Sequence, residues 1–530
     1  MCKTACLIGQ LGAVCLGVVL FTAGPASGAI LDDYVARPDA CYGYDEPIVQ
    51  YTGTVDGLPG TYTAYIFNMT SQEWLDSSRV QPVEWRHWLH VVVPSTVTTD
   101  KALLFISGRD NDDPAPTEVD PLLPFFSLFT NSVTTYLATV PNQPLLFTGQ
   151  TEGRREDEII AYGWDKYLTT EDPNWLVLLP MAKSAVRAMD TVQSFCGDLE
   201  PTGVTVNNFV VTGASKRGWT TWLTAAADSR VSAIAPVVIG LLNMEQSFRH
   251  HFATYGQWSP AVQDYVDMSI FDWLGTEQLE ASRQIIDPYV YLDHYDIPKL
   301  LLNASGDEFF VLDSWQYYYN DLPAEKRLRC FPNTGHAMNG TGTGSDSIEL
   351  TNSLLLFYAA VLADNPMPDF AWSVMHDGSV RVETITPYTP TQVTMWQATN
   401  TTNRDFRYPV TGDAWGSSVL ADQGGGVYVG QVSDPPAGWT AFFVELQFDS
   451  PYPGYAYKFT TGTHVRPDTL PYACDFDQDG DVDLADFTFF VSRWLDDDEW
   501  SSADVIPVGG DGAVDISDFA RFGHHWLRGT

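Results

Sequence analysis

The organisation of the chain follows from one stretch, Asn208-Phe209-Val210-Val211-Thr212-Gly213-Ala214-Ser215-Lys216-Arg217-Gly218-Trp219. Its first half is a β-branched and aromatic run typical of a buried strand, and a helical pattern continues from Trp219 to Ala227. Ser215 therefore lies between two glycines where a strand changes into a helix, which is the setting of a nucleophile elbow. The backbone amide of Lys216, in the first helical turn, is placed to stabilise a developing oxyanion.

Two features of this stretch leave its interpretation open. The usual elbow has a glycine two residues after the serine, whereas here Arg217 occupies that position. A serine flanked by glycines also occurs in ordinary loops that have no catalytic role. Arg217 faces the positive end of the helix dipole, so it needs solvent screening, a carboxylate partner or an anionic substrate group. The candidate carboxylates are Asp110, Glu156 and Glu245.

Charge and the N-terminus indicate an exported protein. The formal net charge is −39, which repels nucleic acid and anionic membrane surfaces, so we expect neither as a partner. Residues 1–29 combine Lys3, an apolar segment from Leu7 to Ala23 and small residues up to Ala29, the pattern of a signal peptide. We therefore expect a secreted, cell-surface or periplasmic protein without a membrane span. Four cysteines remain in the mature chain, and their spacing selects no pairing.

Strand-like runs alternate with helical patterns over residues 30–365. This alternation predicts an α/β fold with a parallel sheet covered on both faces. Residues 243–290 are helical and aromatic and interrupt the alternation, as a cap over an active site does. The expected strands are Ala102–Ser107, Leu145–Thr148, Leu176–Leu179, Phe209–Thr212, Val231–Ile239, Lys299–Asn303 and Lys326–Phe331, and the expected helices include Glu156–Leu168 and Met181–Phe195.

Polar residues follow several of these strands. Gly108 and Arg109 come directly after one strand, where an α/β-hydrolase takes its second oxyanion amide, although a glycine here can simply end the strand. Asp307 and His336 follow two later strands, which gives the chain order Ser215, Asp307, His336. A histidine that accepts the serine proton and a carboxylate that orients it make a catalytic triad.

Asp313 is the alternative acid. It precedes a predicted helix over Ser314–Asp321 and has Gln316 three residues further on, so we interpret it as the N-cap of that helix. Asp307 is then available for chemistry. Residues 366–466 contain short β-runs separated by turns, and they predict a separate β-sandwich with a stabilising or carbohydrate-facing role.

The last segment, 472–530, carries a calcium-loop pattern. Hard oxygen ligands with a glycine at the sixth position are typical of a calcium loop. The first loop offers Asp475, Asp477, Asp479, Asp481 (through its carbonyl), Asp483 and Asp486. A repeat 32 residues later keeps Asp511, Asp515 and Asp518, and its first ligand is in doubt unless an insertion lets Asp504 serve.

Two such loop–helix units at a chain terminus resemble a type I dockerin domain. The resemblance implies structural Ca²⁺ and docking to a cohesin-like partner. The positions expected to face that partner include Leu484, Ala485, Ile516 and Ser517.

The chain from about residue 32 to 465 resembles the PhoPQ-activated pathogenicity-related family. The matching motifs include the elbow, Met69–Trp74, Asn303–Phe310, Pro332–His336, Trp396–Asn400 and Arg404–Arg407. The resemblance implies an α/β-hydrolase fold, a secreted or periplasmic location, and Ser215, Asp307 and His336 as the triad.

Two classes of function remain open. The first is a secreted serine hydrolase that cleaves an ester or amide in a small-molecule, peptide or acyl-sugar substrate. The second is a binding or signalling protein that keeps the fold without turnover.

Overall fold

The computed structural model describes residues 29–201, 203–339, 345–375, 377–476, 482–495, 503, 505 and 513–526. All of the expected signal peptide except Ala29 lies outside these residues. So do four of the expected calcium ligands, namely Asp477, Asp479, Asp481 and Asp511.

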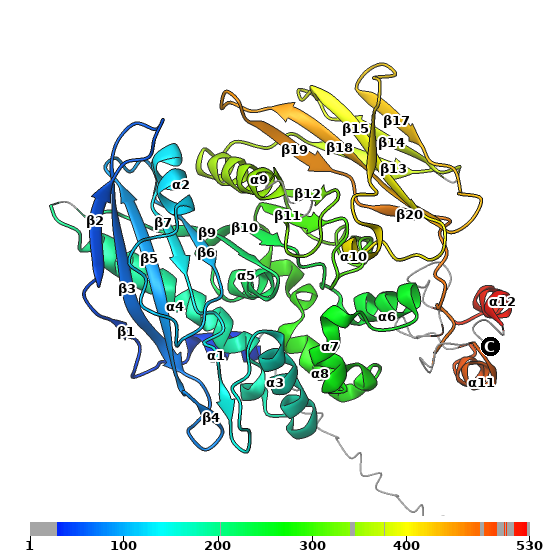
Figure 1. Cartoon of the computed structure of the whole chain (residues 1–530), viewed down its shortest axis with the longest axis horizontal. Coiled ribbons are helices and arrows are strands. Elements are labelled where there is room, and N and C mark those ends of the chain that lie inside the picture. Colours follow the sequence, from blue (N-terminus) through cyan, green and yellow to red (C-terminus); the bar gives the residue numbers. More distant parts are fainter. Residues whose placement is uncertain are drawn as a thin grey trace, which may run out of the picture.

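One mixed sheet of fifteen strands runs through the molecule (Figure 1). Its order is β1-β3-β5-β7-β6-β9-β10-β11-β12-β19-β18-β15-β16, with β2 beside β3 and β20 beside β18. The neighbours from β7 to β12 are parallel, and the pairs on either side are antiparallel. The central strands are β6 (Lys101–Ile106), β7 (Thr134–Leu137), β9 (Asn208–Ala214), β10 (Val231–Val237), β11 (Lys299–Ala304) and β12 (Lys326–Phe331).

The remaining strands lie at the two ends of this sheet or in smaller sheets. The N-terminal group is β1 (Gly43–Tyr44), β2 (Val49–Gly53), β3 (Tyr62–Glu73), β4 (Val80–Gln81), β5 (Glu84–Pro94) and β8 (Leu146–Phe147). The C-terminal group is β13 (Phe370–Val374), β14 (Ser379–Thr384), β15 (Gln392–Asn400), β16 (Gly416–Val419), β17 (Val427–Gln431), β18 (Trp439–Asp449), β19 (Ala456–Thr460) and β20 (His464–Arg466).

Helices cover both faces of the parallel strands. The α-helices are α1 (Ala29–Ala36), α2 (Leu122–Thr130), α3 (Asp157–Thr170), α4 (Leu178–Gly197), α5 (Lys216–Ala227), α6 (Met244–Tyr255), α7 (Gln263–Asp267), α8 (Glu277–Ile286), α9 (Ser345–Leu362), α10 (Tyr408–Thr411), α11 (Leu484–Ser492) and α12 (Ile516–His525). Shorter 3₁₀ helices are η1 (Pro173–Trp175), η2 (Pro260–Val262), η3 (Ile270–Trp273), η4 (Pro288–His294) and η5 (Ser314–Tyr317).

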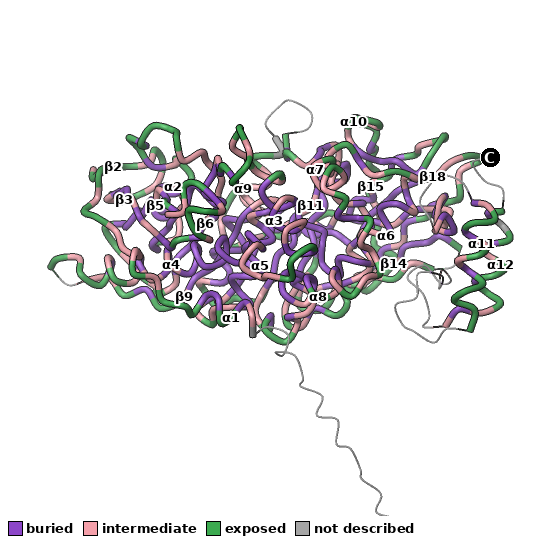
Figure 2. The backbone as a smooth tube through the Cα atoms, turned by 90° about the horizontal axis from the view of Figure 1, so that it is seen from below, coloured by how far each residue is buried: buried purple, intermediate pink, exposed green. Residues whose placement is uncertain are grey.

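Successive side chains along each central strand point to opposite faces of the sheet, and this divides the core into two layers. Ala102 and Leu104 of β6 pack with the residues of α4 and α5, whereas Leu103 packs with those of α2 and α9. Because successive strand residues point to opposite faces, a parallel strand covered on both sides is apolar throughout. Figure 2 shows the buried residues running along the middle of the molecule.

Two expected strands are different in the structure. Leu176–Leu179 is not a strand, because α4 begins at Leu178 and 3₁₀ helix η1 ends just before Leu176. A short buried apolar run suits the start of a buried helix as well as a strand, so the local pattern cannot separate them. The run Leu145–Thr148 shrinks to β8, which pairs with β4 outside the main sheet.

We expected a separate β-sandwich over residues 366–466, but part of this region continues the main sheet. Strand β19 pairs with β12 through Leu328 and Thr460, so β19, β18, β15 and β16 continue the main sheet. Strands β13, β14 and β17 form a second sheet that packs on this extension through a shared core containing Val382, Val444 and Leu446. Pairing between strands this far apart in the chain leaves no signal in local sequence.

The C-terminal segment contacts the helices between β10 and β11. Helices α11 and α12 have a small core of their own, and Figure 1 shows them beside α6. The amide of Tyr472 donates to the carbonyl of Ala253, and the Tyr472 ring lies where a Cβ on Gly256 would stand. The four cysteines of the described chain are free thiols.

Candidate active site

Ser215 has the backbone of a nucleophile elbow. Strand β9 ends at Ala214, α5 begins at Lys216, and Ser215 between them has φ +57° and ψ −125°. This conformation is strained for a residue with a side chain, and such strain concentrates at functional sites. A Cβ on Gly213 would stand 2.6 Å from the Arg217 carbonyl oxygen, which explains the glycine before the turn.

Asp307 and His336 form the second part of the site. The loops after β11 and β12 bring them together, with His336 Nδ1 2.9 Å from Asp307 Oδ2 and 3.0 Å from Oδ1. Burial alone lowers the pKa of His336, but the charge and hydrogen bond of Asp307 outweigh it and leave the pKa raised. The amides of Phe309 and Phe310 donate to Asp307 Oδ1 and hold the carboxylate in place.

Phe309 connects these two parts. Its ring centroid is 4.3 Å from that of His336, and it lines the same cavity as Ser215. Among the described residues, no hydrogen bond joins Ser215 to His336. Catalytic hydrogen bonds are often long before substrate binds, so the arrangement remains compatible with proton transfer.

The cations after Ser215 are paired with two carboxylates at the start of α3. Arg217 makes a bidentate pair with Glu156, with Nη1–Oε2 and Nη2–Oε1 distances of 2.6 and 2.7 Å. Lys216 Nζ lies 2.8 Å from Glu156 Oε2 and 3.0 Å from Asp157 Oδ2. Burial raises the pKa of Glu156, but the two cations more than offset it and lower that pKa. Glu156 is therefore the partner among the three carboxylates considered.

Arg217 also reaches the loop after β6. Its Nε donates to the carbonyl of Val140, and its guanidinium occupies the place of a Cβ on Gly108. A side chain at position 108 would collide with Arg217, so the glycine has a packing role beside the elbow. The Arg109 side chain turns away to the Pro114 carbonyl and Asp113. Oxyanion binding by the amides of Lys216, Gly108 or Arg109 stays a prediction.

Asp313 is not the helix N-cap that we expected. It makes no side-chain cap, and the following helix is only the 3₁₀ helix η5. Instead, Asp313 is buried between Arg404 Nη2 at 2.5 Å and His250 Nε2 at 2.7 Å. Burial raises its pKa, but the charges of Arg404 and His250 outweigh that and lower it. Sequence spacing missed this pair because Arg404 is distant in the chain.

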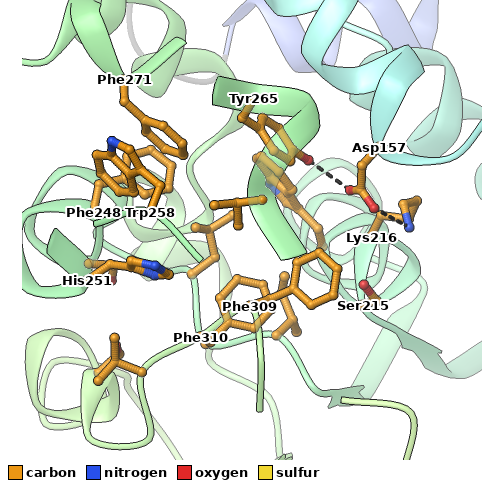
Figure 3. A pocket seen from close by; sticks show the side chains of 18 of the residues that line it. Asp157, Ser215, Lys216, Phe248, His251, Trp258, Tyr265, Phe271, Phe309 and Phe310 are labelled. Carbon is orange, nitrogen blue, oxygen red and sulfur yellow. Dashed lines mark hydrogen bonds and ion pairs between the residues drawn. The ribbon is translucent and has the colours of Figure 1, made fainter. Parts of the chain in front are cut away.

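An aromatic cavity of about 50 Å³ opens beside Ser215 (Figure 3). Trp258 and Phe271 stack at one end with ring centroids 3.6 Å apart, and Asp157 accepts from Tyr265 at the other. A water-sized group occupies roughly 10–15 Å³ of such space, so the cavity holds only a few heavy atoms. Its aromatic walls are Trp164, Trp219, Phe248, Trp258, Tyr265, Phe271, Phe309 and Phe310.

Three functional features escaped the sequence analysis. Glu308 accepts the His336 amide at 2.6 Å and so holds the histidine loop, and its only signal was its place beside Asp307. The Tyr408 amide donates to the Gly306 carbonyl, before Asp307. Asn333, before His336, exchanges two hydrogen bonds with the Trp415 backbone. The C-terminal region therefore supports both of the loops that carry Asp307 and His336.

Comparison with known sequences identifies the family. The sequence model described as PhoPQ-activated pathogenicity-related protein matches residues 31–407. The chain belongs to this family. Autocrine proliferation repressor protein A of Dictyostelium discoideum is 36% identical over 467 residues, covering 83% of this chain and 91% of that protein. The family match ends before the calcium-loop segment.

Solved structures resemble this family member only distantly. An acetyl xylan esterase from Paenibacillus sp. R4 has a TM-score of 0.42 and 13% identity, covering 62% of this chain and 94% of its own. A Pyrococcus horikoshii acylaminoacyl peptidase has a TM-score of 0.35 and 13% identity, covering 57% and 48% respectively. At these TM-scores neither similarity carries an argument about this chain.

The described residues of the two expected calcium loops show a repeated arrangement. Asp483 and Asp515 cap α11 and α12, each in a capping box with Asp486 or Asp518. Asp486 accepts from the amide of Phe476, and Asp518 accepts from that of Val505. Val505 thus corresponds to Phe476. No group of three possible metal ligands is assembled within the described ranges, and no helix there is long and apolar enough to cross a membrane.

Proposed function

We propose that this protein is a serine hydrolase that cleaves an ester or amide bond. The observation that carries the proposal is the strained elbow conformation of Ser215, on a cavity whose wall residue Phe309 packs against a histidine paired with a buried aspartate. The strain at Ser215 suits a nucleophile, because the turn presents the hydroxyl at the start of α5, and Asp307 and His336 follow strands of the same parallel sheet. The family membership is compatible with this reaction but does not define a substrate.

The proposed reaction uses groups of this chain only. Ser215 Oγ attacks the acyl carbonyl carbon while His336 Nε2 accepts the hydroxyl proton, and Asp307 stabilises the imidazolium. The amide of Lys216, with that of Gly108 or Arg109, binds the oxyanion. His336 then donates the proton to the leaving alcohol or amine. Water, deprotonated by the same histidine, then attacks the acyl carbon, and the histidine returns that proton to Ser215 Oγ as the bond to the acyl group breaks.

The alternative is a binding or signalling protein without turnover. The Dictyostelium relative is named as a proliferation repressor, and that name is compatible with this alternative. The narrow aromatic cavity beside Ser215 favours the hydrolase, because it offers room for a small acyl group at the nucleophile. A small molecule, a peptide and an acyl sugar all remain candidate substrates.

Labelling with a fluorophosphonate probe distinguishes a serine hydrolase from a binding or signalling protein without turnover. The parent protein should be labelled, and Ser215→Ala should lose labelling together with about 10³-fold or more of any turnover. Ser247→Ala is the matched control, since Ser247 lines the same cavity but donates its hydroxyl to the Leu242 carbonyl. A folded parent protein that resists the probe would contradict the proposal, and so would equal labelling of Ser215→Ala.

The proposal includes export and docking. The N-terminal pattern supports a secreted, cell-surface or periplasmic location. The carboxylates of the two C-terminal loops are hard oxygen donors that suit structural Ca²⁺. Leu484 and Ile516 are each 66% exposed at equivalent places on α11 and α12, which supports a cohesin-like docking surface.

A further inference from the structure

A second and larger groove lies between the hydrolase strands and the C-terminal β-region. Its volume is about 790 Å³, and no residue lining it also lines the cavity at Ser215. The 3₁₀ helix η5 separates the two spaces, with Ser314 facing the cavity and Trp315 facing the groove. Strand β13 and the segment 324–327 form other parts of its wall.

Aromatic rings gather around Trp372 on one side of this groove. The Trp372 ring centroid lies 6.0 Å from Trp315, 5.7 Å from Tyr319 and 5.8 Å from Phe370. Trp315 is held by a hydrogen bond from its Nε1 to the Thr463 carbonyl. Trp372 is only half-buried, so part of its indole remains accessible from the groove.

Charged groups at the groove compensate one another. Arg327 Nη1 lies 3.3 Å from Asp369, and its Nη2 lies 3.5 Å from Glu325. The Asp369 side chain is 48% exposed, so it can still accept a hydrogen bond from a ligand. At the floor, the buried Nε2 of His464 has no hydrogen-bond partner among the described residues. Burial lowers the pKa of His464 to about 4, so the ring is neutral.

These features match the chemistry of a sugar ring. A pyranose has an apolar C–H face, which packs on an aromatic ring, and a rim of hydroxyls that need donors and acceptors. We propose that this groove binds a neutral saccharide, with Trp372 as the stacking platform and Asp369 as a hydroxyl acceptor. The net charge of −39 disfavours a polyanionic ligand.

An extended peptide is the other candidate ligand. Strand β13 pairs only with β14 among the described strands, so its free edge could accept a peptide strand. Such pairing would leave the Trp372 ring and the compensated charges without a role. The saccharide accounts for more of the groove.

Affinity electrophoresis of the full chain tests the proposal. Native gels containing soluble arabinoxylan, hydroxyethyl cellulose or galactomannan should retard the protein, whereas polygalacturonate should not. Trp372→Ala should weaken retardation at least about tenfold, because it removes the stacking surface. Trp494→Ala is the matched control, since Trp494 is also partly exposed but lies on the C-terminal segment.

Folding and hydrolysis serve as separate readouts. Ala371→Arg fills the groove from an exposed position without removing a core side chain, so it should also abolish retardation if Trp372→Ala fails to fold. Probe labelling of Ser215 should be unchanged in both variants, which keeps this test independent of the proposed hydrolysis. Absence of retardation in all three neutral gels would overturn the proposal. Full retardation of folded Trp372→Ala, or binding of an extended peptide alone, would also overturn it.

Discussion

At the scale of single residues, Ser215 and Glu156 share one unusual feature. Both begin a helix with nearly the same strained backbone, φ +57° and ψ −125° for Ser215 and φ +50° and ψ −127° for Glu156. Each such residue costs on the order of 1–3 kcal/mol and persists only where its surroundings hold it. Here the Glu156 carboxylate binds both cations that follow Ser215, so each strained turn helps to fix the other.

The two candidate acids should respond differently to substitution. Asp307→Asn should lower turnover by about 10⁴-fold, because it leaves His336 in the wrong tautomer. Above the folded pKa of His336, where its ion pair with Asp307 is already lost, the variant should lose little stability. Asp313→Asn should cost about 3–5 kcal/mol of unfolding free energy, because it breaks the buried pair with Arg404. Turnover and urea unfolding of both variants provide the measurement. The reverse pattern would make Asp313 the catalytic acid.

The raised pKa of His336 predicts opposite pH trends for activity and stability. His336 must be neutral to act as a base, so kcat/KM should rise as pH passes through its folded pKa, above the ordinary 6.5. Its ion pair with Asp307 stabilises the fold fully below the unfolded pKa and is lost as pH rises through the folded one. Asp307→Asn should move the activity midpoint to lower pH, and an unmoved midpoint would exclude His336 as the base.

At the scale of elements, the sequence predicted most reliably those features that depend on residues close together in the chain. The strand–turn–helix at Ser215, helix α3 and the positions of Asp307 and His336 after strands all come from local patterns. The start of α4, the burial of Asp313 and the pairing of β12 with β19 depend on distant partners. Likewise, three carboxylates were candidates for Arg217, and only the position of the start of α3 beside Arg217 selects Glu156.

Arg217→Lys tests the ion pair that connects the start of α3 to α5. Lysine cannot reproduce the two parallel hydrogen bonds to Glu156 or the bond to the Val140 carbonyl, so we expect a loss of about 1–2 kcal/mol and lower kcat/KM. Arg381→Lys is the control, because its pair with Glu383 is exposed at the surface. Equal melting temperatures and kinetics for Arg217→Lys and the parent would show that the bidentate pair between Arg217 and Glu156 has no role.

At the scale of the whole molecule, the C-terminal segment should depend on calcium. Without a cation, its clustered carboxylates repel one another, so chelation should expose residues beyond about 472 to protease while Ser215 labelling continues. Asp477→Asn should raise the calcium concentration needed for protection, whereas Asp293→Asn, at an exposed site on the 3₁₀ helix η4, should not. Protection that is equal with and without chelator would contradict the calcium assignment.

The pairing of β12 with β19 has a consequence for shortened forms of this protein. A chain cut where the family match ends, at residue 407, would lose β16, β17, β18, β19 and β20. Strand β12 would then become an open edge and β15 would lose both of its partners, so both would expose unpaired amides and carbonyls that can join another chain. Such a fragment would keep Ser215, Asp307 and His336 and still be expected to aggregate, because the strands that terminate its sheet lie beyond the cut.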